Sequence, residues 1–186
     1  MTEEINATLK ILRDGGVILY PTDTIWGLGC DATNDMAVQK IFRIKKREDS
    51  KSMLLLLDDK GKLDNYVSVP DIAWDLIGLS KSPLTIIYPG ARNIAPGLIA
   101  IDGSTGIRIT NDEFCHQLIR RFGKPIVSTS ANISGTPSPS NFKEIDEKLK
   151  SSVDYVVNWR QNDHIKKQHS SIIKLELNGS FKIIRK

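Results

Sequence analysis

Short apolar runs that alternate with helical patterns constrain the fold of this 186-residue chain more than any other feature. The runs GVILYP (16–21), SMLLLLDD (52–59) and LTIIY (84–88) are too short and too continuous for helices, and are typical of buried strands. TGIRI (105–109) and KPIVSTSAN (124–132) predict two further strands. Strands that alternate with helices favour an α/β or α+β fold, with one mixed, twisted, open sheet flanked by helices.

The segments between these runs predict helices, and the end of the chain predicts further strands. Thr2 is expected to cap the first helix, and Thr33 or Asn34 the second. Asn141 and Glu144 resemble the capping box of a later helix. The remaining helices are expected over 70–79, 112–122 and 142–150, and late strands over 153–157, 171–177 and 180–186, the last two joined by a hairpin at Asn178-Gly179.

Length and composition indicate the class of protein. Residues 1–186 suit a single domain, and 40% hydrophobic with 26% charged residues is typical of a soluble globular protein. The longest apolar runs fall well short of the roughly 20 residues that a membrane span needs, and the N-terminus does not resemble a secretory signal. The default expectation is therefore a cytoplasmic protein without a membrane partner.

Cysteine and histidine spacing argues against a metal site held by the protein. Cys30 and Cys115 are far apart and lack CxxC spacing, so reduced thiols are expected. The three histidines, His116, His164 and His169, form no cluster with ligand spacing. The net charge of +4 is too small to indicate nucleic-acid binding by itself.

Four polar stretches follow predicted strands or helices, namely PTDTIWG (21–27), KKREDSK (45–51), IRIT (107–110) and STSANISG (128–135). In open α/β sheets such stretches can converge in a crevice at the strand ends, although they are distant in sequence. Each stretch also has an ordinary interpretation. KKREDSK would be a solvated charge run and STSANISG a set of turn formers. Arg108 of IRIT would face outward, and Trp26 of PTDTIWG would be a core residue.

The residue types in these stretches suit an anionic ligand. Lys45, Arg47 and Lys51 could clamp a polyphosphate, since lysine acts as a point charge and arginine as a fork. Ser128, Ser130 and Asn132 occupy every second position, so all three would share one face if the strand continues. The sequence contains neither a P-loop nor a Rossmann fingerprint, and no serine or cysteine triad is evident. Any reaction would then depend on positioning and cationic stabilisation.

Five motifs in order carry a resemblance to a known family. PTDTIWGLGCDA, the K-x-R of IKKRED, GIRI, STSANISG and the terminal SSII…IIR occur as in the YrdC-like family. From about Leu12 to Arg185, the chain resembles the short, single-domain threonylcarbamoyl-AMP synthases of that family. The resemblance implies a twisted α/β sheet with a concave cationic cavity.

The resemblance also implies a reaction. Members of the family are nucleotidyltransferases that condense L-threonine, bicarbonate and ATP into L-threonylcarbamoyladenylate and pyrophosphate, with Mg2+ accompanying ATP. A downstream threonylcarbamoyl transferase complex then modifies tRNA, so a direct tRNA contact is also conceivable. Carried onto this chain, Lys45 and Arg47 would be catalytic and would hold phosphates together with Lys51. Threonine would be bound by Thr24, Trp26, Arg108 and Ser170, and ATP also by Ser130, Asn132, Ser140 and Arg185.

Two alternatives stay open at the level of sequence. One is an RNA-binding module that grips tRNA or double-stranded RNA through its phosphates. The other is a protein of the same fold that acts on a different carbamoyl-type substrate. Lys45 and Arg47 are both expected on the surface, so that alanine variants would leave the fold intact.

Overall fold

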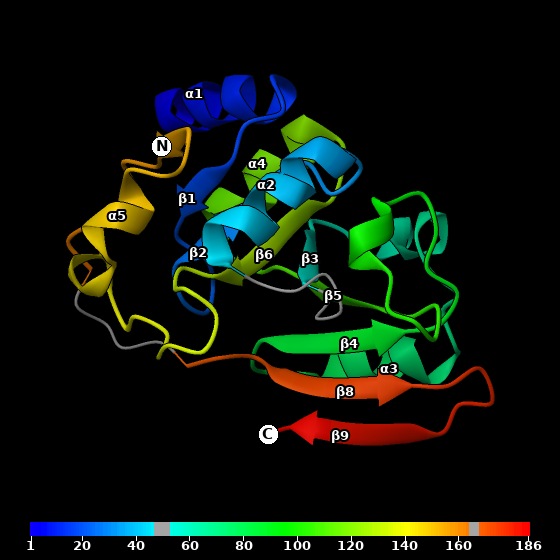
Figure 1. Ribbon diagram of the computed structural model, residues 1–186. Helices are drawn as coiled ribbons and strands as arrows, with labels where there is room; N and C mark the ends of the chain where they lie inside the picture. The colour runs from blue at the N-terminus through cyan, green and yellow to red at the C-terminus, as the bar shows by residue number, and fades with distance from the viewer. Residues whose placement is uncertain (47–52, 164–167) are drawn as a thin grey trace.

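The computed structural model describes residues 1–46, 53–163 and 168–186. Nine strands in this part of the chain form one sheet with the order β7-β1-β2-β6-β3-β5-β4-β8-β9 (Figure 1). The strands are β1 Ile18–Tyr20, β2 Gly27–Gly29, β3 Leu54–Leu57, β4 Leu84–Tyr88, β5 Thr105–Ile109, β6 Ile126–Ser130, β7 Tyr155–Val156, β8 Ser171–Leu175 and β9 Phe181–Arg185.

Helices flank this sheet, as the sequence predicts. They are α1 Thr2–Arg13, α2 Asp35–Lys45, α3 Ile72–Leu79, α4 Glu113–Phe122 and α5 Glu147–Lys150, with short 3-10 helices η1 Lys60–Asn65, η2 Pro96–Leu98 and η3 Phe142–Glu144. Within the described ranges, every helix is too short or too polar to cross a bilayer.

The sheet is mixed, which confirms the predicted fold class. β1 with β7, β3 with β5 and β4 with β8 run parallel, whereas the other neighbouring pairs of the described sheet are antiparallel. Ile107 of the central strand β5 lies opposite Leu55 on one side and Ile86 on the other. These three apolar residues continue one hydrophobic face across the sheet.

Two hydrophobic clusters cover the two faces of the sheet. Ile18 and Tyr20 of β1 point to the cluster formed with α1 and α4, whereas Leu19 belongs to the cluster formed with α2. This alternation follows from the two-residue period of a strand. Figure 1 shows α1 and α4 packed together over the β1 side of the sheet. α1 and α4 cover only one part of their face of the sheet. Over β4, β5 and β8 the same face extends past these two helices.

The polar stretch PTDTIWG leads into strand β2, which begins at the last residue of the stretch, Gly27. Gly27 and Gly29 allow this strand to approach its neighbours closely. A Cβ at Gly29 would lie 2.6 Å from Cε1 of Tyr20 and 2.8 Å from the carbonyl oxygen of Val127. No apolar run marks this segment, so the sequence does not predict the strand.

Three predicted boundaries are also wrong. Thr2 is the first helical residue of α1 rather than its cap, which is Met1. The helix expected over 142–150 is divided into η3 and α5, because Ile145 is extended and Asp146 caps a new turn. The hairpin at Asn178-Gly179 is confirmed, with Gly179 at φ 81°, but its strands are shorter than predicted, because β8 ends at Leu175 and β9 begins at Phe181.

Candidate active site

A cavity of about 440 Å3 opens on the sheet face that α1 and α4 leave uncovered. Thr85 of β4 and Arg108 of β5 line it, whereas their neighbours Ile86 and Ile107 point to the opposite core. The lining also includes Ser128 and Ser130 of β6 and Ile172 of β8. Residues of PTDTIWG, IRIT and STSANISG therefore meet over the face of the sheet, rather than only in a crevice at the strand ends as expected. Most of the fourth polar stretch, KKREDSK, lies outside the described residues.

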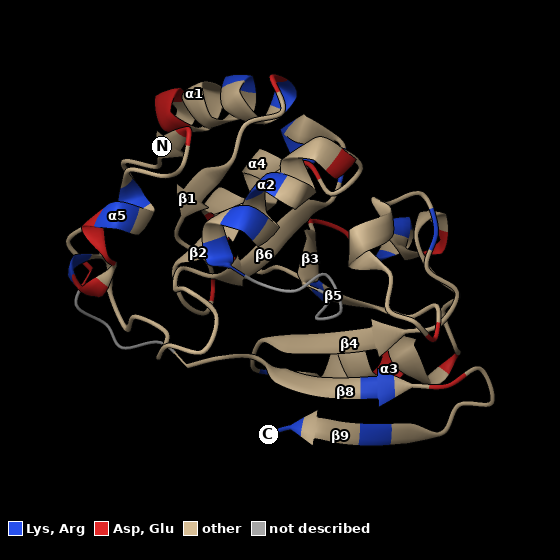
Figure 2. Ribbon diagram, viewed as in Figure 1, with Lys and Arg blue, Asp and Glu red and all other residues tan. Residues whose placement is uncertain are grey.

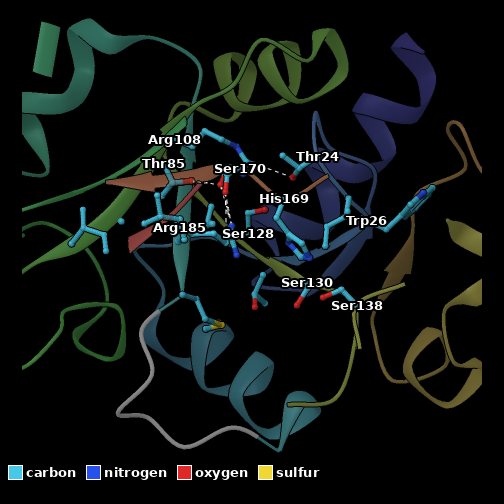
Figure 3. Close-up of a pocket in the computed structure, with 18 residues that line it drawn as sticks. Thr24, Trp26, Thr85, Arg108, Ser128, Ser130, Ser138, His169, Ser170 and Arg185 are labelled. Carbon is cyan, nitrogen blue, oxygen red and sulfur yellow. Dashed lines mark hydrogen bonds between the residues drawn. The ribbon is translucent and has the colours of Figure 1, made fainter. Parts of the chain in front are cut away.

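Arg108 lies at the base of this cavity. Its side chain is 2% exposed, and Nη2 lies 2.9 Å from Oδ1 of Asp23. Nη2 also donates to Oγ1 of Thr24 at 3.2 Å (Figure 3). Asp23 and Thr24 both come from the stretch before β2, so this stretch fixes the guanidinium. A buried arginine that faces a cavity can receive a carboxylate, and the outward-facing interpretation of Arg108 is wrong.

Ser170 and Arg185 form a second side of the cavity. Oγ of Ser170 lies 2.8 Å from Oγ1 of Thr85, across the parallel pair β4 and β8. Arg185 of β9 donates from Nε and Nη2 to the carbonyl oxygen of Ser170, at 2.9 and 2.7 Å. Partial burial and the charge of Arg108 lower the pKa of Arg185. The cavity thus contains two guanidinium groups within each other's field.

Trp26 serves as both a core residue and a wall of the cavity. It is 7% exposed, and its ring centroid lies 4.8 Å from that of Phe142. It lines the main cavity and also a small neighbouring pocket. The interpretation of Trp26 as a core residue is therefore compatible with its interpretation as a residue of the ligand site.

Lys45 is buried, which contradicts its predicted place on the surface. The residue is 1% exposed, and Nζ donates to the carbonyl oxygens of Ser130 and Asn132 at 2.5 and 2.6 Å. It lies outside the cavity lining and instead fixes the turn that follows β6. Figure 2 shows the basic end of α2, where Lys45 lies, beside this turn.

Two predicted ATP contacts, Asn132 and Ser140, lie outside the main cavity. β6 ends at Ser130, so Asn132 does not continue the alternation, and its amide donates to the carbonyl oxygens of Ile133 and Thr136. Ser140 lines the small pocket beside Trp26 instead. Arg47 and Lys51 lie outside the described residues.

The cavity also contains residues that the site prediction missed. Thr85, Ser128, Ser138 and His169 line it, and their hydroxyl and imidazole groups add to its polar character. Thr85 could have been suspected as a polar residue inside an apolar strand, as Arg108 was. His169 offers no such signal, because it stands in a polar segment before β8.

The donor groups of the described residues do not form a metal cage. Groups of three or more His, Cys, Asp or Glu side chains that could hold an ion are absent from these residues. Cys30 and Cys115 are buried free thiols, and burial raises the pKa of both. Both cysteines thus behave as core residues.

Comparison with known proteins places the chain in a family. A family model described as "Sua5_yciO_yrdC: Telomere recombination" matches residues 10–186. The chain belongs to the Sua5/YciO/YrdC family. It is 35% identical over 157 residues to the threonylcarbamoyl-AMP synthase of Pseudoalteromonas translucida, covering 82% of this chain and 84% of that relative.

Two solved structures show the shared fold of this Sua5/YciO/YrdC member. Escherichia coli YciO superposes with a TM-score of 0.86 at 26% identity, covering all of this chain and 90% of YciO. P. abyssi Sua5, crystallised in complex with L-threonine, superposes with a TM-score of 0.82 at 24% identity. That match covers 92% of this chain but half of the Sua5 chain, so Sua5 contains a region that this chain does not match.

Proposed function

We propose that this protein is an L-threonylcarbamoyladenylate synthase, a nucleotidyltransferase that condenses L-threonine, bicarbonate and ATP and releases pyrophosphate. The observation that carries the proposal is a hydroxyl-lined cavity with the buried, Asp23-held Arg108 at its base. The relative from P. translucida, which bears the name of this enzyme, supports it over four fifths of the chain.

The base of the cavity suits the amino-acid substrate. Arg108 would pair with the threonine carboxylate, while Thr24 and Ser170 offer hydroxyl groups on either side of it. Trp26 would close over the substrate. The complex of P. abyssi Sua5 with L-threonine is consistent with an amino-acid ligand in this fold.

Other residues of the cavity lining suit the nucleotide. Ser130 and Arg185 belong to this lining and would contact ATP, and Ser138 adds a further hydroxyl group. Ser140, which lines the small pocket beside Trp26, stays a predicted ATP contact. The contacts of Lys45 support a positioning role, in which its ammonium holds the turn that carries Ser130. Roles for Arg47 and Lys51 on the phosphates, and for Asn132 near ATP, stay predictions.

Magnesium would accompany ATP rather than occupy a resident protein site. The described lining offers hydroxyl oxygens and no carboxylate, and Mg2+ with nucleotides is usually held by phosphates, water and few protein groups. The donor set therefore fits an ion that arrives with the substrate. When bound, it would neutralise charge on the phosphates.

The charges of the cavity suit the chemistry. The N-carboxylate of threonine and the triphosphate of ATP are both anions, so their approach is opposed by repulsion. Arg108 and Arg185 bring positive charge to the cavity in which both would bind, and cations placed before the reaction stabilise a phosphoryl-transfer transition state. The cavity would also hold the reactants close together.

We further propose that the product is passed to a threonylcarbamoyl transferase complex that modifies tRNA in the cytoplasm. A direct contact between this protein and tRNA stays a prediction. Figure 2 shows acidic residues at one end of α1 and basic residues at the other, and both kinds on α5, rather than one continuous basic stripe along these helices. This distribution favours the enzyme over the RNA-binding module as the primary function.

The first experiment measures pyrophosphate release by the purified protein from ATP, Mg2+ and bicarbonate. Release is expected with L-threonine and reduced with L-serine, with threonylcarbamoyladenylate identified by mass spectrometry. Release with a carbamoyl donor such as carbamoyl phosphate, and none with threonine, would instead favour a same-fold protein with another carbamoyl-type substrate. A folded protein inactive under all these conditions would contradict the proposed function.

Arg108→Lys tests the threonine pocket. Lysine keeps the positive charge but lacks the planar guanidinium, whose several donors can bind Asp23 and a substrate carboxylate at the same time. We expect the KM for threonine to rise at least tenfold, while the KM for ATP stays within twofold. Steady-state kinetics with each substrate varied in turn would measure both, and a selective rise in the KM for ATP would reverse the assignment of the two subsites.

A further inference from the structure

His169 lies in the cavity but has no role in the proposed function as described so far. It is the residue before Ser170, in the segment that leads into β8. Figure 3 shows its imidazole ring among the cavity-lining side chains, between Ser128 and Trp26 in this view. The ring therefore reaches the space in which the substrates would meet.

The proposed reaction needs a proton acceptor. Threonine enters mainly as an ammonium ion at neutral pH, and an ammonium group has no lone pair with which to attack bicarbonate. Loss of one proton gives the amine, which forms the N–C bond to the bicarbonate carbon and expels water, leaving the N-carboxylate. Overall, the ammonium and bicarbonate give the N-carboxylate, one water and one proton.

Among the described lining residues, His169 is the one side chain suited to take this proton near neutral pH. The other ionisable groups in that lining are the guanidinium groups of Arg108 and Arg185, which stay protonated. The two nearby carboxylates are placed differently. Asp23 is paired with Arg108, and Asp163 lines the small neighbouring pocket, which shares Trp26 with the cavity, rather than the cavity itself.

We propose that His169 is a catalytic residue that accepts the proton from the ammonium group of the threonine substrate. This inference rests on the proposed function. The proton passes to a ring nitrogen of His169, giving an imidazolium, and leaves to water before the next turnover. Arg108 and Ser170 would hold the substrate carboxylate, which leaves the ammonium group in the same cavity that His169 lines.

The surroundings keep the ring ready for this role. Although the residue is exposed as a whole, desolvation of the ring and the charges of Arg185 and Arg108 lower the pKa of His169 below its usual value of 6.5. The imidazole is therefore neutral at physiological pH, the form that accepts a proton. Activity should fall as the pH drops through this lowered pKa, because the protonated ring cannot act as a base.

The test compares His169→Gln and His169→Ala with the wild type in threonine-dependent pyrophosphate release between pH 5 and pH 9. General-base catalysis contributes about 100-fold to 10,000-fold, so we expect kcat of both variants to fall at least 100-fold at pH 7.5. The wild-type limb set by His169 should be replaced by a rise in activity toward the pKa of the threonine ammonium group, because only the free amine can then react, and added imidazole should restore at least tenfold to His169→Ala. His116→Gln, on α4, is the matched control and should keep the wild-type rate and profile.

Two results would overturn the inference. One is a His169→Gln enzyme within twofold of the wild type at every pH. The other is a slow variant that keeps the wild-type pH profile and does not respond to imidazole, which would indicate a positioning role. Both require an active wild type, so they are distinguishable from failure of the proposed function, in which the wild type itself releases no pyrophosphate with threonine.

Discussion

Lys45 is predicted to be solvated from the sequence but is buried in the structure. In the sequence it begins a run of charges, and such runs are usually solvated. In the structure it is the last residue of α2, and its ammonium is buried against the carbonyl oxygens of Ser130 and Asn132. It therefore contributes to stability as well as to the geometry of the site.

Lys45→Met should destabilise the protein by about 3–6 kcal/mol. Methionine keeps much of the apolar stem but removes two charged hydrogen bonds, each of which contributes about 1.5–3 kcal/mol. Urea unfolding would measure the loss of free energy. Lys46→Met, at the neighbouring exposed position, is the control and should change stability by less than about 0.5 kcal/mol. Equal effects of the two variants would contradict the structural role of Lys45.

At the scale of elements, strand β2 depends on glycine. It lies between β1 and β6, and its residue Gly29 faces the ring of Tyr20. No apolar run marks this strand, because two of its three residues are glycines that make room for neighbouring strands. β2 follows directly from the segment with Asp23, Thr24 and Trp26, so the strand holds this segment beside the cavity.

Gly29→Ala should destabilise the sheet by about 1–3 kcal/mol, since the added methyl group overpacks a closed site. Its Cβ would approach Val127 and Tyr20 to within 3 Å. Gly106→Ala is the matched strand control, because a Cβ there would meet its nearest neighbour at 3.5 Å. That control should leave stability unchanged or raise it by about 0.5–1 kcal/mol. Thermal unfolding would measure the change in stability of both variants. A Gly29→Ala protein as stable as the wild type would contradict the close packing of β2.

At the scale of the whole molecule, ion pairs between distant segments couple stability to pH. Lys174 of β8 donates to Asp102 in the turn before β5, at 2.6 Å. The hydrogen bonds from Lys174 and Ser104 lower the pKa of Asp102 from 3.8 to about 2. A lowered carboxyl pKa stabilises the fold above pH 3.8, and this contribution is lost as the pH falls toward 2.

Asp102→Asn should therefore be less stable than the wild type at pH 5, and this difference should shrink between pH 4 and pH 2. Urea unfolding at a series of pH values measures it. Asp71→Asn is the control, since the exposed Asp71 makes no side-chain capping bond to α3. A difference between Asp102→Asn and the wild type that is constant with pH would contradict the coupling. The effect is expected to be small, because the pair is exposed.

The sequence by itself determined most of the elements, the mixed sheet and the family, although it marked neither strand β2 nor the division of the helix expected over 142–150. Strands such as 84–88 and 105–109 have the bounds expected from their apolar runs, because periodicity is a local property. Arg108 could be singled out for the same reason, as a charge within an apolar strand. These features are encoded within a few residues of one another.

Only the tertiary structure decided which of these residues meet. Thr24 contacts Arg108 across 84 positions of sequence, and Thr85 contacts Ser170 across 85. Such contacts depend on the strand order β6-β3-β5-β4-β8 and on which face each strand turns to the cavity. The inward turn of Lys45 and the place of His169 in the cavity follow from the same order, because a cavity is formed by the packing of distant segments and leaves no periodic trace in the chain.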